Sequence, residues 1–170
     1  MAKLVLASAS PRRQALLRQI GVSDFQIRIS DAGEFYSPDL SPAEIVETLS
    51  RRKAEAVACG PDELIIAADT MVFLDSCRLG KPADAADALR MLRALQGRLH
   101  TVRTGITVRQ GERLITESEA TEVLFRSASD AELQAYVRSG EPLDKAGAYG
   151  IQGLGALLVE RLNGDYFNVM

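Results

Sequence analysis

The run Leu4-Val5-Leu6-Ala7-Ser8-Ala9-Ser10-Pro11-Arg12-Arg13 decides the fold, because an apolar stretch leads directly into the start of a helix. Ser10 suits the N-cap, Pro11 suits the first helical position, and Gly21 suits the residue just after the helix end. The sequence therefore predicts a strand, a tight turn and a helix over 11–20.

The turn in this stretch has the chemistry of an anion site. Free backbone N–H groups and the positive end of the helix dipole meet there, beside the hydroxyls of Ser8 and Ser10 and the guanidinium groups of Arg12 and Arg13. A phosphate group fits this combination. An ordinary capped helix with surface arginines is the alternative for this segment taken alone.

The rest of the chain alternates between strand-like and helix-like segments, which predicts an α/β fold with a mixed sheet flanked by helices. We expect a single domain over 1–170. The further strands are expected over 25–29, 64–68, 71–74 paired with 78–80, 99–109, 113–125 and 156–162. The further helices are expected over 42–57, 83–95 and 130–139, with capping boxes opening the first and the last.

Composition excludes several classes of protein. The 170 residues include 20 Lys and Arg against 23 Asp and Glu, so the net charge of −3 argues against a general nucleic-acid binder. Cys59 and Cys77 lack CxxC spacing, and His100 is the only histidine, so neither a zinc site nor a disulfide framework is indicated. The sequence holds no apolar stretch long enough to span a bilayer, so we expect a cytoplasmic protein without a membrane partner.

Asp69 is the leading candidate for catalysis. It follows the apolar run 64–68, and ligands of open α/β sheets bind beyond the carboxyl ends of strands. A carboxylate there could hold a divalent cation or accept a proton from water. The alternative is a turn residue, although the hydroxyl of Thr70 beside it favours a site. The expected hairpin would return Lys81 to the neighbourhood of Asp69.

Three further charged residues are candidates around a polyphosphate. Lys53 and Lys81 could offset its negative charge, although isolated lysines are usually solvated and Lys53 falls late in a helix, where it complements the dipole. Glu34 lies in the polar loop 31–40, where a solvated carboxylate is the simpler interpretation.

The segment 144–155 contains four glycines, which permit close backbone approach. It matches neither G-x-G-x-x-G nor a P-loop, so a structural turn is the alternative. Gln152 within it carries an acceptor and two donors that could read a nucleobase edge.

Taken together, five segments resemble the Maf proteins, which are nucleoside triphosphate pyrophosphatases once described as septum-formation inhibitors. The segments are Leu6-Ala7-Ser8-Ala9-Ser10-Pro11-Arg12-Arg13, Lys53-Ala54, Ala68-Asp69-Thr70, Gly80-Lys81-Pro82 and Asp144 through Gly153. Asp69-Thr70 and the Ala-Tyr-Gly-Ile-Gln-Gly loop are similar to the subgroup acting on dTTP and UTP. The resemblance implies an ITPase-like fold with a nucleotide cleft, and hydrolysis between the α- and β-phosphates with Mg²⁺ or Mn²⁺.

The resemblance also implies residue roles. Asp69 would act as base or metal ligand, with Glu34 helping to position the metal or water. Phosphates would be bound by Arg12, Arg13, Lys53 and Lys81 and by the hydroxyls of Ser8 and Ser10. Gln152 and Thr70 would recognise the base or place the water. The partners implied are a nucleoside triphosphate and, in a homodimer, a second copy of the chain.

The chain departs from the Maf pattern in two places. The region 31–35 is looser than the usual acidic pattern, and because the sequence ends at Met170 we expect it to lack the C-terminal helix that family members usually have. Two other functions stay open: a nucleotide-binding regulator of septum formation, and the same chemistry on a purine or 7-methyl-GTP substrate. A carboxylate at position 69 argues against the pure binder, because it repels a polyphosphate unless a metal or a catalytic step requires it.

Overall fold

The computed structural model describes residues 2–170, which form two compact units. The first unit comprises the chain up to Asp69 together with Thr104–Glu119, and the second comprises Thr70–Arg103 and Ala120–Met170. Three long strands supply residues to both units. Each unit is described below by itself.

The strands of the described chain form a mixed sheet in the order β2-β1-β3-β5-β6-β7, and β4 pairs with β3. Their bounds are β1 (Lys3–Leu6), β2 (Phe25–Ile27), β3 (Glu63–Leu74), β4 (Cys77–Leu79), β5 (Leu99–Gln110), β6 (Arg113–Phe125) and β7 (Val159–Asn163). β1 is parallel to β2 and β3, whereas the β3–β4 and β6–β7 pairs are antiparallel. The expected α/β class with a mixed sheet flanked by helices is confirmed.

The helices alternate with these strands along the chain. They are α1 (Pro11–Gln19), α2 (Pro42–Glu55), α3 (Ala85–Leu95), α4 (Asp130–Arg138) and α5 (Tyr166–Val169). Three short 3₁₀ segments, η1 (Glu141–Asp144), η2 (Ala146–Ala148) and η3 (Leu154–Leu158), overlap the glycine-rich region. None of the helices within residues 2–170 is long and apolar enough to cross a membrane.

The start and end of α1 follow the sequence signals with one exception. Pro11 opens the helix, and Gly21 ends it at a φ of 86°, where its N–H donates to the Arg18 carbonyl over 3.0 Å. Ser10 occupies the predicted N-cap position, and the exception is that its side chain makes no capping hydrogen bond. Its backbone N–H donates instead to Ser8 Oγ over 3.2 Å, because the turn folds back on itself.

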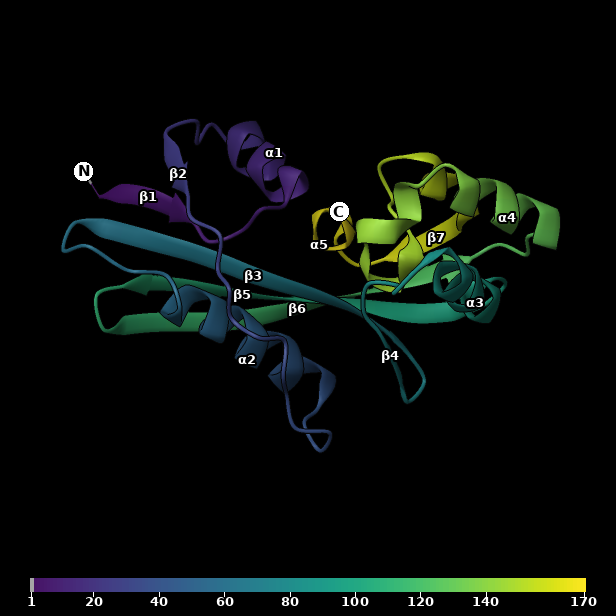
Figure 1. Cartoon of the computed structure of the whole chain (residues 1–170), viewed down its shortest axis with the longest axis horizontal. Helices are drawn as coiled ribbons and strands as arrows, with labels where there is room; N and C mark the ends of the chain where they lie inside the picture. Colours follow the sequence, from purple (N-terminus) through teal and green to yellow (C-terminus); the bar gives the residue numbers. More distant parts are fainter. Residues whose placement is uncertain (1) are drawn as a thin grey trace. The chain divides into compact units, whose positions relative to one another are not determined.

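α2 packs on one face of the first unit. Its capping box is confirmed, with Ser41 and Glu44 each bonding the other's backbone N–H. An apolar cluster joins α2 to β1 and β3 through Val5, Ala7, Ala54, Val57, Ile65 and Ala67. Figure 1 shows α1 on the opposite side of β3 from α2.

β3 is longer than the sequence predicted. A strand over 64–68 was expected to end at Asp69, but β3 runs without a break to Leu74. The strand that stops is β1, whose last paired residue, Leu6, lies opposite Ile66. Beyond Ile66, β3 continues because other strands pair with it, β4 among them. Asp69 consequently lies inside a strand, past the carboxyl end of its shorter neighbour.

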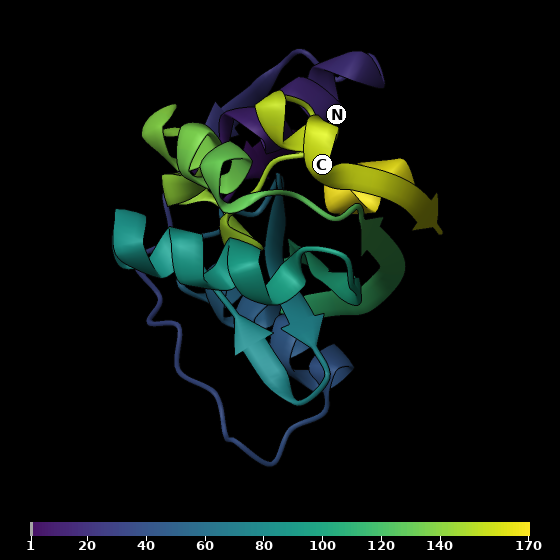
Figure 2. The same ribbon diagram turned by 90° about the vertical axis from the view of Figure 1, so that its right-hand side faces the viewer.

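The second unit is built around α3, α4 and the distal strand segments. α3 packs against α4 over a core that includes Phe125, Leu133 and Leu92 (Figure 2). The predicted hairpin is confirmed, with Val72 paired to Leu79 across a turn that contains Asp75.

Other predicted element boundaries are also wrong. The second strand ends at Ile27, two residues early, and α3 begins at Ala85 because the Asp84 side chain caps it by accepting from the Asp87 N–H over 2.8 Å. The predicted strand over 156–162 opens instead as η3, and β7 begins only at Val159.

Candidate active site

The first unit buries Asp69 on the face that α2 covers. Side chains alternate along a strand, so Asp69 shares a face with Ile65 and Ala67, which pack in the apolar cluster beneath α2. Asp69 is 6% exposed. A carboxylate this buried requires a charged or hydrogen-bonded partner.

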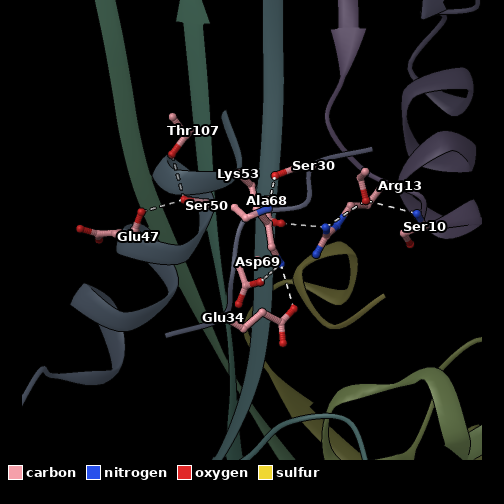
Figure 3. Close-up of polar contacts among 12 residues, drawn as sticks. Ser10, Arg13, Ser30, Glu34, Glu47, Ser50, Lys53, Ala68, Asp69 and Thr107 are labelled. Atoms are coloured by element: carbon pink, nitrogen blue, oxygen red, sulfur yellow. Dashed lines mark hydrogen bonds and ion pairs between the residues drawn. The ribbon is translucent and has the colours of Figure 1, made fainter. Parts of the chain in front are cut away.

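Lys53 of α2 supplies that partner. Its ammonium group donates to Asp69 Oδ1 and lies 3.3 Å from Glu34 Oε1, so one cation joins two carboxylates (Figure 3). The Lys53 side chain is 17% exposed, whereas Glu34 is 65% exposed. The structure thus brings together three residues that the sequence analysis nominated from separate segments, with Asp69 at the buried end and Glu34 at the solvent end.

The electrostatics of the cluster are set mainly by burial. Burial raises the pKa of Asp69 above its ordinary value, and the Lys53 ammonium opposes this through its charge and its hydrogen bond. The Arg13 guanidinium lowers the pKa of Asp69 further, whereas Glu34 raises it. The net effect is a carboxylate that is more basic than one on the surface.

Arg13 completes the edge where β1 stops. Its Nη1 donates to the carbonyl oxygen of Ala68 over 2.7 Å and to Ser8 Oγ over 3.1 Å (Figure 3). The Ala7 N–H donates to the Ile66 carbonyl of β3. The Ala68 carbonyl lies two residues further along β3 and points to the same edge, so the Arg13 guanidinium binds β3 where β1 no longer pairs with it. Burial lowers the pKa of Arg13, opposed by the charge of Asp69, and the group remains cationic.

Ser8, Ser10 and Arg12 lie at the same turn. Ser8 is buried and accepts hydrogen bonds from Arg13 and from the Ser10 N–H, so its hydroxyl organises the turn. Arg12 is half-buried in the first turn of α1. The predicted strand, turn and helix start therefore gather these residues at one end of β1.

The remaining candidates belong to the second unit. Lys81 follows β4 and is exposed, and Gln152 is exposed between η2 and η3. A hydrogen bond of 3.0 Å from the Gly147 N–H to the Gly80 carbonyl joins their two segments. Thr70 follows Asp69 directly and its side chain points to the other face of β3. The expected proximity of Lys81 to Asp69 stays a prediction.

Sequence reasoning missed two partners in the first unit. The Ala68 carbonyl anchors Arg13, and no residue type could have signalled a backbone group. Arg52 donates to the Phe35 carbonyl, so it tethers the loop that carries Glu34. The run of basic residues in α2 was the available signal, but only Lys53 within it was singled out as a candidate ligand.

The donor set of Asp69 and Glu34 suits a hard divalent cation. Mg²⁺ is commonly held by one or two carboxylates, with water and substrate phosphates as the other ligands. Within residues 2–170, no group of three or more His, Cys, Asp or Glu side chains could form a complete protein cage. The two carboxylates therefore fit a cation that shares its coordination with a phosphorylated substrate.

Comparison with protein families identifies the chain. The model for Maf-like proteins matches residues 3–170. The chain belongs to the Maf family. Among its Maf relatives, a protein of Moorella thermoacetica named dTTP/UTP pyrophosphatase is 52% identical, and the alignment covers 100% of this chain and 89% of that protein.

Two other members of the Maf family carry the same name. The protein of Salinibacter ruber is 52% identical over 98% of this chain and 83% of its own length, and that of Symbiobacterium thermophilum is 47% identical over 100% and 88%. The solved structure of the Staphylococcus aureus Ham1 protein is similar in fold, with a TM-score of 0.50 and 18% identity over 86% of this chain and 85% of that one.

Proposed function

We propose that this protein hydrolyses dTTP and UTP to the nucleoside monophosphate and pyrophosphate. The observation that carries the proposal is the buried pair of Asp69 and Lys53, at the sheet edge where β1 ends and the Arg13 guanidinium lies. The shared name of the three relatives, dTTP/UTP pyrophosphatase, supports the substrate class.

The chemical step is an in-line displacement at the α-phosphorus. A water oxygen forms the new P–O bond while the bond from the α-phosphorus to the bridging oxygen breaks, and that oxygen leaves with pyrophosphate. Asp69 takes up a proton from the attacking water, or ligates the cation beside it. Burial favours the first role, because it raises the pKa of Asp69 and makes the carboxylate a better proton acceptor.

Cationic side chains offset the charge that builds up on the phosphoryl oxygens. We assign this role to Arg13 and Lys53 in the first unit, with Arg12 and the Ser8 and Ser10 hydroxyls binding phosphate at the helix start. Lys53 also keeps Asp69 ionised by direct contact. Lys81 of the second unit is proposed as a further phosphate ligand.

A divalent cation, Mg²⁺ or Mn²⁺, is proposed as the cofactor, held by Asp69 and Glu34. When bound, it would supply positive charge to the phosphate oxygens. Lys53 touches both carboxylates, so it has to share them with the cation.

Gln152 is proposed to recognise the base, with Thr70 assisting. Uracil and thymine present an acceptor, a donor and an acceptor along the pairing edge, and one carboxamide with backbone groups can match them. A location in the cytoplasm and assembly as a homodimer stay predictions.

The test is pyrophosphate release from UTP, dTTP, CTP, GTP, 7-methyl-GTP and ITP with Mg²⁺ or Mn²⁺. We expect wild type to prefer UTP and dTTP, and Asp69→Asn to lose at least about a hundredfold in kcat while still binding nucleotide. Asp62→Asn, at an exposed turn of the same unit, is the matched control and should retain activity.

Other outcomes separate the alternatives. Nucleotide binding without turnover of any substrate would favour the regulator, and a preference for GTP, 7-methyl-GTP or ITP would keep the chemistry but overturn the assignment of the base. Full activity in Asp69→Asn would remove this residue from the mechanism.

A further inference from the structure

The segment that carries Gln152 is held by a carboxylate outside the proposed mechanism. Glu141 opens η1, directly after Gly140 ends α4 at a φ of 77°. The left-handed glycine turns the chain sharply, and Glu141 lies beside Leu154 and Gly155, which follow it in sequence by 13 and 14 positions. Its carboxylate faces inward to this loop.

Glu141 and Tyr136 bind the loop through its backbone. Glu141 Oε2 accepts from the Leu154 N–H over 2.8 Å, and Oε1 accepts from the Gly155 N–H over 3.1 Å and from the Tyr136 hydroxyl over 2.9 Å. The Tyr136 oxygen in turn accepts from the Gly150 N–H over 3.1 Å. Three backbone N–H groups thus end on one connected pair of side chains.

These bonds lie on both sides of Gln152. Gly150 precedes it by two residues and Leu154 follows it by two, so the short segment between them is tied at each end. Gln152 itself is exposed, as a residue that meets a ligand must be. The backbone from which the Gln152 side chain extends is therefore held on either side.

Two of the four glycines in the loop lie against the same two side chains. A Cβ at Gly153 would lie 2.3 Å from Glu141 Oε2, and one at Gly155 would lie 2.6 Å from the Tyr136 hydroxyl. The glycines let the carboxylate and the phenol approach the backbone.

The carboxylate is ionised in this setting. Burial raises the pKa of Glu141, but the hydrogen bonds from Gly155, Leu154 and Tyr136 outweigh it and hold the pKa below its ordinary value. Hydrogen bonds to an ionised acceptor are stronger than neutral ones. Replacing the carboxylate with an amide places an NH₂ group against N–H donors, so at least one bond is lost.

We infer that Glu141 is a positioning residue that sets base selectivity, by holding residues 150–155 in the conformation that presents Gln152 to the base. The inference rests on the proposed function and adds a residue to it.

The experiment compares Glu141→Gln with wild type on UTP and CTP, which differ at the base edge. We expect the ratio of kcat/KM for UTP to that for CTP to fall about tenfold, as for one lost hydrogen bond to a charged acceptor. Glu160→Gln, an exposed glutamate of β7 in the same unit, is the control and should keep the ratio. In a Gln152→Ala background, Glu141→Gln should lower the ratio no further, because both changes act through Gln152.

A folded Glu141→Gln variant with an unchanged ratio would overturn the inference, and so would an equal loss on both substrates, which a purely structural role predicts. If Glu141→Gln does not fold, Tyr136→Phe removes the hydroxyl that links Gly150 to the carboxylate and is judged by the same ratio. If wild type does not prefer UTP over CTP, the proposed function and this inference are both overturned. If wild type prefers UTP but Glu141→Gln leaves the ratio unchanged, only the inference is overturned.

Discussion

His100, the only histidine in the sequence, should make the folding stability fall as the solution is acidified below about pH 6.5. It lies on β5 with 3% exposure, and its Nε2 is 2.8 Å from the Tyr149 hydroxyl. The imidazole packs edge-to-face against Phe125 and Tyr149, with ring centroids 4.9 and 5.4 Å away. This site favours the neutral ring, because a charged imidazolium would lose its hydration.

The magnitude follows from the two protonation equilibria. Burial lowers the pKa of His100 to about 4 in the folded protein, against an ordinary value of 6.5 in the unfolded chain. Between these values the unfolded chain binds more protons, so stability is lost as pH falls and is fully present above about 6.5. The gap of about 2.5 pH units, at about 1.36 kcal/mol per unit, corresponds to about 3.4 kcal/mol. Domains of this size have about 5–15 kcal/mol in total, so the loss is large.

The assay is urea unfolding of wild type and of His100→Gln at pH values from 8 down to 4, in steps of about half a pH unit. The amide is neutral throughout, so the free energy of unfolding of wild type should fall more steeply than that of the variant, by up to about 1.4 kcal/mol per pH unit. Tyr149→Phe removes the hydroxyl but keeps the buried imidazole, so it should lower stability while retaining the steep slope. The imidazole resonance can be followed directly, since no other histidine overlaps it.

Parallel curves for wild type and His100→Gln would refute this reasoning. So would an NMR titration of the imidazole in the folded protein centred near pH 6.5. Either result would mean that the ring is hydrated or that the protonated ring finds a partner.

Two further predictions concern the first unit. Lys53→Gln removes the ammonium that lowers the pKa of Asp69, so the acidic limb of the kcat/KM profile should move to higher pH, while Arg51→Gln on the exposed side of α2 should leave it in place. Gly105→Ala should cost more than about 2 kcal/mol in urea unfolding, because its Cβ would lie 2.4 Å from a backbone oxygen of α2. Gly111→Ala, in open space at a φ of 58°, should cost about 1 kcal/mol, and equal costs would contradict the predicted clash.

Local signals in the sequence were sufficient for much of the fold. The helix start at Pro11, the capping boxes of α2 and α4 and the turn at Gly21 all act within a few residues, so propensity and hydrogen-bonding chemistry decide them without help from distant segments. The long strands β5 and β6 were likewise predicted within one residue of their bounds.

Boundaries that depend on neighbouring strands were not predictable in the same way. Asp is a residue type common at strand ends, yet β3 continues past Asp69 because other strands pair with the later residues of β3. The expected strand over 156–162 opens as η3, where the Ala156 N–H donates to the Gly153 carbonyl over 3.1 Å. Pairing between strands decided that β3 continues, whereas a local i→i+3 backbone hydrogen bond formed η3.

The sequence by itself determined which residue types this protein brings to its chemistry: an acidic residue after an apolar run, basic residues in two helices and a glutamine among glycines. Only the tertiary structure decided that Lys53 joins Asp69 to Glu34, that Arg13 binds the open edge of β3, and that Glu141 holds the glycine-rich loop. These contacts link residues from 13 to 55 positions apart. Hydrophobic packing of helices on the sheet brings such residues together, and no local pattern encodes which partners will meet.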